Sequence, residues 1–124
     1  MAQNKIVRFG PVAMSATLTT NILNPGTTTG GVGMPASSGN LYFIIKHIRI
    51  VNKTGGNVNV SLWIGATGGN VAGTEFAWQA TPVPSNSFLE WFGQLRLDAA
   101  DFLVGGAAAG TSLTFEAEGE IGVN

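Results

Sequence analysis

The chain has 124 residues and a formal net charge of −1, and only 10% of its residues are charged. This length predicts one domain, and a hydrophobic content of 44% is enough to form a core. The lack of cysteine excludes disulfides, cysteine-ligated zinc and a thiol nucleophile. The 18 glycines are typical of many short strands joined by small-residue turns. The low charge also suits a surface that neighbouring subunits cover.

The first forty residues are expected to form an N-terminal arm with short strands and a loop. Lys5 to Phe9 predicts either a short edge strand or an arm, and Pro11 confines that segment to a sheet edge because it lacks an N–H donor. The threonine-rich stretch Met14 to Ile22 predicts a further strand. Asn24 to Asn40 contains five glycines and no charge, which indicates a long loop. That loop either orders against a neighbouring subunit or remains a floppy surface loop.

The strongest strand signal is Leu41 to Asn52, where both faces are partly apolar. This pattern is typical of a central strand with one face in the core and the other partly covered, in this case by another subunit. Lys53 to Gly56 predicts a tight turn, since glycine supplies positive φ angles. Val58 to Ile64 then alternates as a half-buried strand. Its Trp63 is expected to face outward, where a large aromatic side chain marks a contact.

The C-terminal half predicts more short strands and no sustained helical period. The candidates are Glu75 to Trp78, Ser87 to Trp91, Gln94 to Leu97 and Leu113 to Ile121. About seven or eight strands in total favour a single antiparallel β-sandwich or jelly-roll-like domain with an extended N-terminal arm. In this interpretation residues 1–40 are the arm and loop, and residues 41–124 are the β-sandwich core.

Charge is distributed unevenly along the chain. Residues 1–53 carry five bases and no acid, whereas residues 97–124 carry five acids and no base. Either the two segments pair within one subunit, or they make head-to-tail contacts between subunits. Glu116, Glu118 and Glu120 share one face of the last strand and need such partners. The candidate partners are Lys46, Arg49 and Arg96 of the same chain, and Lys5 and Arg8 of a neighbouring subunit.

No group of residues in the sequence forms a recognisable catalytic motif. His47 is the single histidine, too few ligands for a zinc site, and no nucleophile-elbow motif accompanies it. Asp98 and Asp101 flank a turn and are expected to cap its backbone rather than bind calcium. We therefore expect no catalytic residues, no cofactor and no metal. A sugar-stacking platform remains an alternative, built from Trp63, Trp78, Trp91 and Tyr42.

The partners and location follow from charge and hydropathy. The scattered bases and a sequence pI of about 5.6 argue against a nucleic-acid partner. No signal peptide and no membrane-spanning helix are expected, because the apolar runs are too short. We expect the protein to be made in the cytoplasm of a cell. Assembly of the protein into a larger particle fits the same observations.

Five stretches together resemble the strand rhythm of small all-β structural proteins of tailed bacteriophages. Those proteins recur as capsid decoration (cement) proteins and as modules of tails and fibres. The resemblance covers roughly residues 41–121. The stretches are FIIKHIRIVN (Phe43 to Asn52), VNVSLWIG (Val58 to Gly65), PVPSNS (Pro82 to Ser87), LRLDAADFL (Leu95 to Leu103) and TSLTFEAEG (Thr111 to Gly119).

The resemblance implies a non-enzymatic virion protein on the outer capsid surface. Such a protein binds the major capsid protein as a homotrimer and stabilises the head against the pressure of the packed DNA. A tail, fibre or connector component is one alternative, and a carbohydrate-binding β-sandwich module is another. The residues expected at an interface are Lys5, Arg8, Pro25, Met34, Trp63, Glu116 and Glu118.

Overall fold

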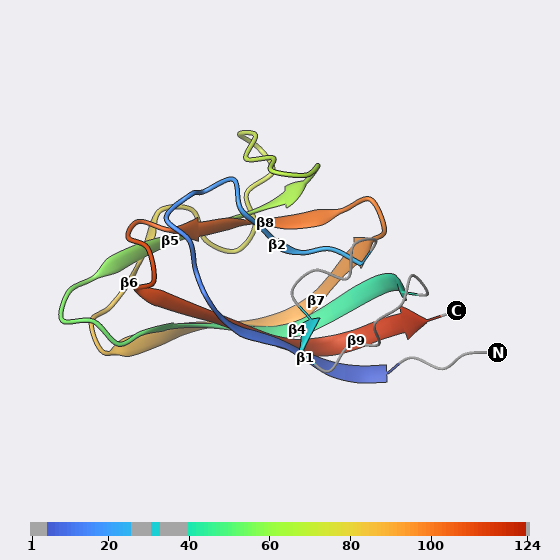
Figure 1. Ribbon diagram of the computed structural model, residues 1–124, viewed down its shortest axis with the longest axis horizontal. Helices are drawn as coiled ribbons and strands as arrows, with labels where there is room; N and C mark the ends of the chain where they lie inside the picture. The colour runs from blue at the N-terminus through green and yellow to red at the C-terminus, as the bar shows by residue number, and fades with distance from the viewer. Residues whose placement is uncertain (1–4, 26–30, 33–39, 124) are drawn as a thin grey trace.

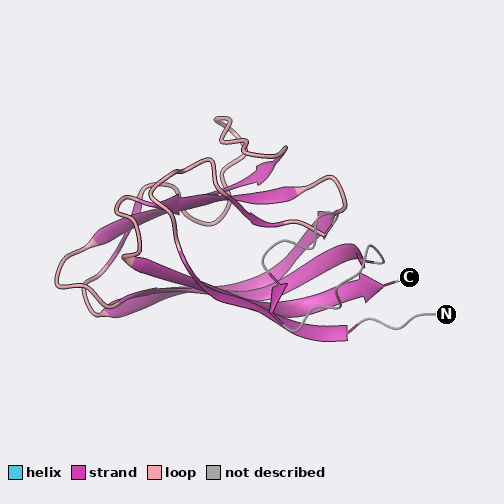
Figure 2. Cartoon of the chain, viewed as in Figure 1, coloured by secondary structure: helices cyan, strands magenta, loops and turns pink. Residues whose placement is uncertain are grey.

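The computed structural model describes residues 5–25, 31–32 and 40–123, and within them nine strands form two antiparallel sheets (Figure 1). One sheet contains five strands, in the order β3 (Gly31–Val32), β1 (Lys5–Ala13), β9 (Leu113–Val123), β4 (Asn40–Asn52) and β7 (Ser87–Asp98). The other contains four, in the order β2 (Asn21–Leu23), β8 (Phe102–Ala107), β5 (Val58–Gly65) and β6 (Thr81–Val83). The all-β expectation is confirmed, since the described residues contain strands and loops without a helix (Figure 2). A helix able to cross a membrane is accordingly not found in this part of the chain.

One cluster of buried side chains joins the two sheets. Phe9 and Phe115 from the five-stranded sheet, and Leu62 and Leu103 from the four-stranded sheet, all belong to it. Each of these side chains is at most 1% exposed. Full burial of one such side chain contributes roughly 1.5–3 kcal/mol to folding. The inner faces of both sheets therefore form a shared apolar layer, and the outer faces are left for other roles.

Of the two alternatives for the segment beginning at Lys5, the structure shows a strand. β1 pairs with β9 on one side and β3 on the other, and it continues to Ala13. The register with β9 shifts between Phe9 and Val12, so Pro11 lies at an irregularity where its missing N–H breaks no ladder. The strand alternative is therefore confirmed, and residues 5–13 belong to the sheet rather than to an arm.

Two stretches expected to be strands are mostly loop. Residues 14–20 form a loop, and a strand begins only at Asn21. Ser15 and Thr20 in that loop still accept backbone hydrogen bonds from β8. Glu75 to Trp78 contributes a single isolated bridge, between Glu75 and Trp63. In both stretches only a few backbone groups pair with a neighbouring strand, so no regular ladder of hydrogen bonds forms.

The two-sided apolar pattern of β4 comes from a bulge. Phe43 and Ile45 are buried before it, and Ile48 and Ile50 are buried after it. The register with β9 skips Lys46, which has no partner there. Because side chains alternate with a period of two, one extra residue reverses which positions face the core. Four apolar side chains that the sequence assigned to two faces therefore enter one core, and Ile44 stays on the opposite face beside Glu120.

The exposure expected for Trp63 is wrong, because its side chain is only 5% exposed although it lies on the outward side of its strand. Trp63 points away from the core that Leu62 enters, and its cross-strand partner Val104 is buried too. Asn21 connects two loops near this face: its Nδ2 donates to Thr67 Oγ1 over 2.8 Å, and its Oδ1 accepts from the backbone N–H of residue 68 over 2.7 Å. Figure 1 shows these loops beside the four-stranded sheet. The chain's own loops thus lie over the side of the four-stranded sheet that points away from the core.

The bulge brings β4 very close to β9 at Gly119, which predicts a steric test. A Cβ atom on Gly119 would lie 2.0 Å from the backbone oxygen of Ile44, whereas one on Gly55 would meet nothing within 4 Å. We expect Gly119→Ala to lower the free energy of unfolding by about 1–3 kcal/mol, the usual cost of overpacking. Gly55→Ala is the matched control and should change it by less than about 0.5 kcal/mol. Urea unfolding of both variants is the measurement, and equal midpoints would contradict the close approach.

Candidate interface on the outer face of the five-stranded sheet

The outer face of the five-stranded sheet, called here the outer face, carries charged and aromatic side chains in cross-strand rows. The register of β1, β9, β4 and β7 aligns them directly opposite one another. Residues opposite one another on one sheet face have side chains within contact distance. The three rows are Ile6–Glu120–Ile44–Arg96, Arg8–Glu118–His47–Phe92 and Glu116–Arg49–Glu90.

Charges on the outer face pair within the chain. His47 lies between two carboxylates, with Nε2 2.7 Å from Glu90 Oε2 and Nδ1 3.4 Å from Glu118 Oε1. Arg49 Nη2 donates to the same Glu90 oxygen over 3.1 Å. Lys46 donates to Glu120. The intrachain alternative for the uneven charge distribution is therefore confirmed for β4 and β9.

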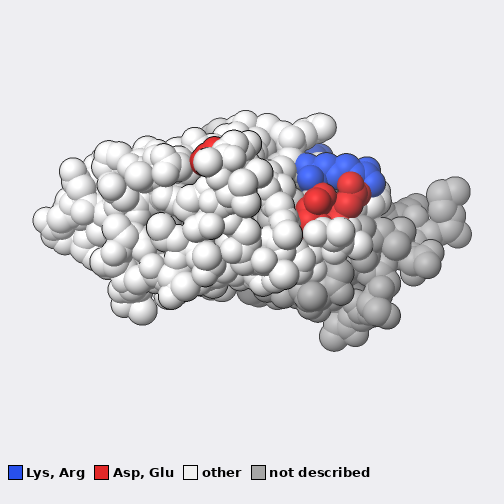
Figure 3. Space-filling model, turned by 90° about the horizontal axis from the view of Figure 1, so that it is seen from above, with Lys and Arg blue, Asp and Glu red and all other residues white. Residues whose placement is uncertain are grey.

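Charged side chains occupy little of the rest of the surface. On the face drawn in Figure 3, basic and acidic side chains gather side by side at one end, and most of the remaining described surface is uncharged. This agrees with a composition of only 10% charged residues. On this face, most of the charged side chains thus lie where opposite signs meet, and one acidic patch stands apart.

Glu90 is the carboxylate most affected by this pairing. Its hydrogen bond from Arg49, followed by the one from His47, lowers the pKa of Glu90 below its usual value. Both partners stabilise the ionised form, because a hydrogen bond to a carboxylate is charge-assisted. Glu90 is therefore an acceptor at neutral pH and helps to orient the imidazole of His47.

Aromatic rings on this face remain largely open to solvent. Phe92 stacks on His47 with ring centroids 4.6 Å apart, yet it is 70% exposed. The Arg49 guanidinium lies 5.3 Å from the ring centre of Phe88, which is 50% exposed. Ile6 at the opposite side is 89% exposed. Between them lies a shallow hollow of about 310 Å³ lined by Ile6, Lys46, His47, Phe92, Glu118, Gly119 and Glu120.

The structure brings together only some of the residues expected at an interface. Arg8 lies opposite Glu118, and Glu116 follows on the same face of β9. Lys5 begins β1, opposite Ile121. Pro25 lies two residues after the end of β2 and is buried. Met34 lies outside the described residues.

Sequence reasoning missed the residues that give the outer face its character, namely Ile6, His47, Phe88 and Phe92. A signal was present, because Phe88, Glu90 and Phe92 alternate with Leu89 and Trp91 along one strand. That alternation allows either set to face outward, and only packing against the core decides it.

The tryptophans do not form an exposed platform. Trp63 is buried, and Trp78 and Trp91 are half-buried against the core cluster. The ring of Trp91 meets Phe76 edge-on, with centroids 5.0 Å apart. A sugar ring stacks on an open aromatic face, and the described positions of these side chains give the carbohydrate-binding alternative no structural support.

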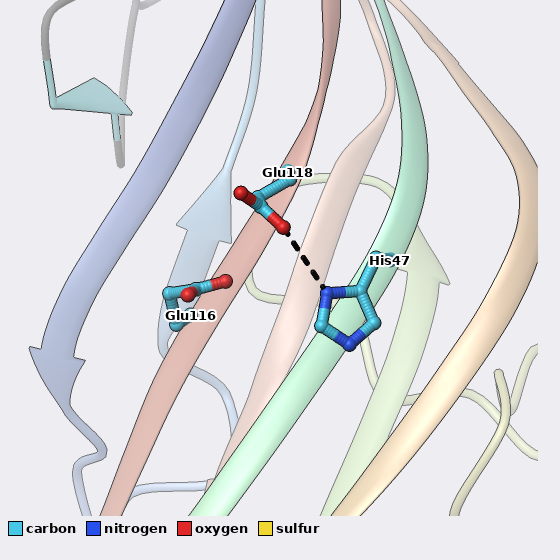
Figure 4. Close-up of side chains that lie close together, drawn as sticks. All are labelled: His47, Glu116 and Glu118. Atoms are coloured by element: carbon cyan, nitrogen blue, oxygen red, sulfur yellow. Dashed lines mark hydrogen bonds and ion pairs between the residues drawn. The ribbon is translucent and has the colours of Figure 1, made fainter.

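Two groups of acidic residues were candidates for binding a metal ion. In the turn after β7, the backbone N–H of Asp98 donates to Asp101 Oδ2 over 2.9 Å, so the expected backbone cap is confirmed for Asp101, whereas the Asp98 carboxylate pairs with Arg96. On the outer face, His47, Glu116 and Glu118 each offer a ligand atom, and these atoms lie within 4.8 Å of one another (Figure 4). The second group was not foreseen, because its members come from strands far apart in the sequence.

Comparison of the chain with protein-family models, with curated proteins and with solved structures finds no match. The role of the outer face is therefore inferred from its own side chains. Exposed apolar rings among paired charges are typical of a surface that contacts another macromolecule. On the same face, His47, Glu116 and Glu118 bring three potential ligand atoms close together.

The lowered pKa of Glu90 predicts an acid-dependent loss of stability. Because the pKa is lower in the folded state than in the unfolded state, ionised Glu90 stabilises the fold above its ordinary pKa of about 4.5. This contribution is lost as the pH falls through the folded-state pKa. We expect Glu90→Gln to have a lower melting temperature than the wild type at pH 7, and the gap to close towards pH 3. Thermal unfolding across this range is the measurement, with Asp98→Asn, an exposed acid on the same strand, as the control. A gap that is the same at every pH would show that the ion pairing is not responsible.

Proposed function

We propose that this chain is a non-enzymatic structural protein of a bacteriophage virion, namely a capsid decoration protein that binds the outer shell of the head. The observation that carries the proposal is the outer face, where Phe92, Phe88 and Ile6 remain exposed beside a network of paired charges. The four-stranded sheet covers its buried outward residues with the chain's own loops. The outer face is therefore the sheet surface left for a partner.

The energetics of the outer face favour contact with another protein. Covering an exposed phenylalanine ring removes apolar surface from water and contributes roughly 1.5–3 kcal/mol when burial is complete. Charges usually oppose such burial, because an unpaired charge loses its hydration. On this face Glu90 already has two partners, His47 and Arg49. A partner surface can thus cover the aromatic rings while Glu90 keeps its two hydrogen-bond partners.

The fold and the sequence both fit this role. We interpret the two antiparallel sheets as a sandwich of the jelly-roll type, the architecture that the phage resemblance implies. The resemblance lies in the strands that build the outer face and its opposing sheet, at residues 41–121. In this proposal the chain assembles as a homotrimer, contacts the major capsid protein, and adds interface area that must break before the shell opens. Many modest contacts repeated by symmetry then resist the outward pressure of the DNA.

The proposal predicts that Phe88 and Phe92 anchor the protein to the shell. We expect Phe88→Ser combined with Phe92→Ser to weaken binding to heads that lack this protein by about tenfold or more, since 1.4 kcal/mol corresponds to tenfold in affinity. Co-sedimentation of purified protein with the heads is the measurement. Val71→Ser is the control, because Val71 is also apolar and is 65% exposed but lies on the loop after β5.

Three outcomes decide between the alternatives. Loss of head binding in the double variant alone supports the outer face as the docking surface. Full binding by the double variant contradicts that assignment. If the wild type binds tails and not heads, the chain is a tail or fibre component instead, and the same variant then tests whether the outer face makes that contact.

A further inference from the structure

We propose that His47, Glu116 and Glu118 form a zinc-binding site on the outer face, with one coordination position left open. The three ligands are those drawn in Figure 4. They comprise one imidazole nitrogen and two carboxylates, donor types that zinc accepts at about 2.0–2.2 Å. The inference concerns the isolated chain, so it stands or falls separately from the capsid proposal.

The strand geometry brings the ligands together. Glu116 and Glu118 are two residues apart on β9 and therefore share a face, and His47 on β4 is the direct cross-strand partner of Glu118. The three ligand atoms lie within 4.8 Å of one another. Atoms around a tetrahedral zinc lie about 3.4 Å apart at these bond lengths. The two glutamate side chains would rotate to close the difference.

His47 is already oriented as a ligand. Its side chain is 12% exposed and stacks on Phe92, and its Nε2 lies 2.7 Å from Glu90 Oε2. A proton on Nε2 that is donated to Glu90 leaves the lone pair of Nδ1 directed at Glu118, 3.4 Å away. Metal-bound histidines usually donate their second ring N–H to a carboxylate in this way. In that tautomer, a cation between Nδ1 and Glu118 would form a ligand bond to each of them.

Glu116 supplies an independent observation. Its Oε1 is buried and has no hydrogen-bond partner. A carboxylate oxygen in that position loses its hydration without compensation, unless another group provides it. The nearest bases bond elsewhere, since Arg49 Nη2 donates to Glu90 and Arg8 Nε donates to the backbone oxygen of residue 10. Arg49 Nε also lacks a partner, so the competing arrangement is an Arg49–Glu116 ion pair.

The site would hold two strands together and still accept a fourth ligand. Three protein ligands and one open position are typical of zinc sites that keep a water or bind an external group. Two of the proposed ligands, His47 and Glu118, also line the hollow beside Ile6 and Phe92. Water or a donor side chain of a bound partner can complete the coordination there.

The test uses full-length protein without a histidine tag, titrated with zinc chloride near neutral pH. Because the chain contains one histidine, nitrogen NMR of its ring reports on His47 alone. We expect binding of one zinc ion per chain by calorimetry, a zinc-induced change at Nδ1 rather than at Nε2, and a higher melting temperature. These readouts need no activity and no partner.

Variants assign the ligands. Glu116→Gln and Glu118→Gln should each abolish measurable one-to-one binding. Glu90→Gln should weaken it by about 10- to 100-fold, the usual cost of losing the carboxylate behind a metal-bound histidine. Glu120→Gln is the matched control, since it lies on the same face of β9 and should bind as the wild type does.

Several results would overturn the site. They are no heat of binding in excess zinc, a response of His47 at Nε2, or wild-type affinity in both ligand variants. Equal losses in Glu120→Gln and Glu118→Gln would indicate nonspecific attraction to the acidic strand. The wild-type NMR response decides the question even if a variant fails to fold.

Discussion

The structure depends on one extra residue in β4. Lys46 has no partner in the register with β9, and its insertion reverses the alternation of the longest strand in the chain. On one side of it Phe43 and Ile45 enter the core, and on the other side Ile48 and Ile50 do. Without the bulge, half of this central strand would turn its isoleucines to solvent. The packing of both sheets against β4 therefore depends on that irregularity.

The same bulge shapes the outer face. Two consecutive residues, Lys46 and His47, both direct their side chains to acids of the outer face, where Lys46 pairs with Glu120 and His47 reaches Glu90 and Glu118. A regular strand would send one of the two into the core, at the cost of burying a polar group. The backbone irregularity thus serves packing on one side of the sheet and electrostatics on the other.

His47 is where the two proposals meet. It stacks on Phe92, which we propose as an anchor for the capsid shell, and it faces Glu118, which we propose as a zinc ligand. Aromatic contact and ligand chemistry are compatible here, because stacking uses the ring face and coordination uses the ring edge. The hollow beside the two side chains gives a partner access to both.

The sequence by itself determined the secondary-structure class and most strand positions. Alternation in Val58 to Ile64 and in Leu113 to Ile121 predicts strands that the structure contains, and the opposite charges of β4 and β9 predict that the two could pair. Only the tertiary structure decided which way the side chains face. Trp63 is buried because loops distant in sequence lie over its sheet, and β1 is a strand because β9 is there to pair with it. Periodicity reports local backbone geometry, whereas covering loops, bulges and the convergence of His47, Glu116 and Glu118 depend on contacts between segments far apart in the chain.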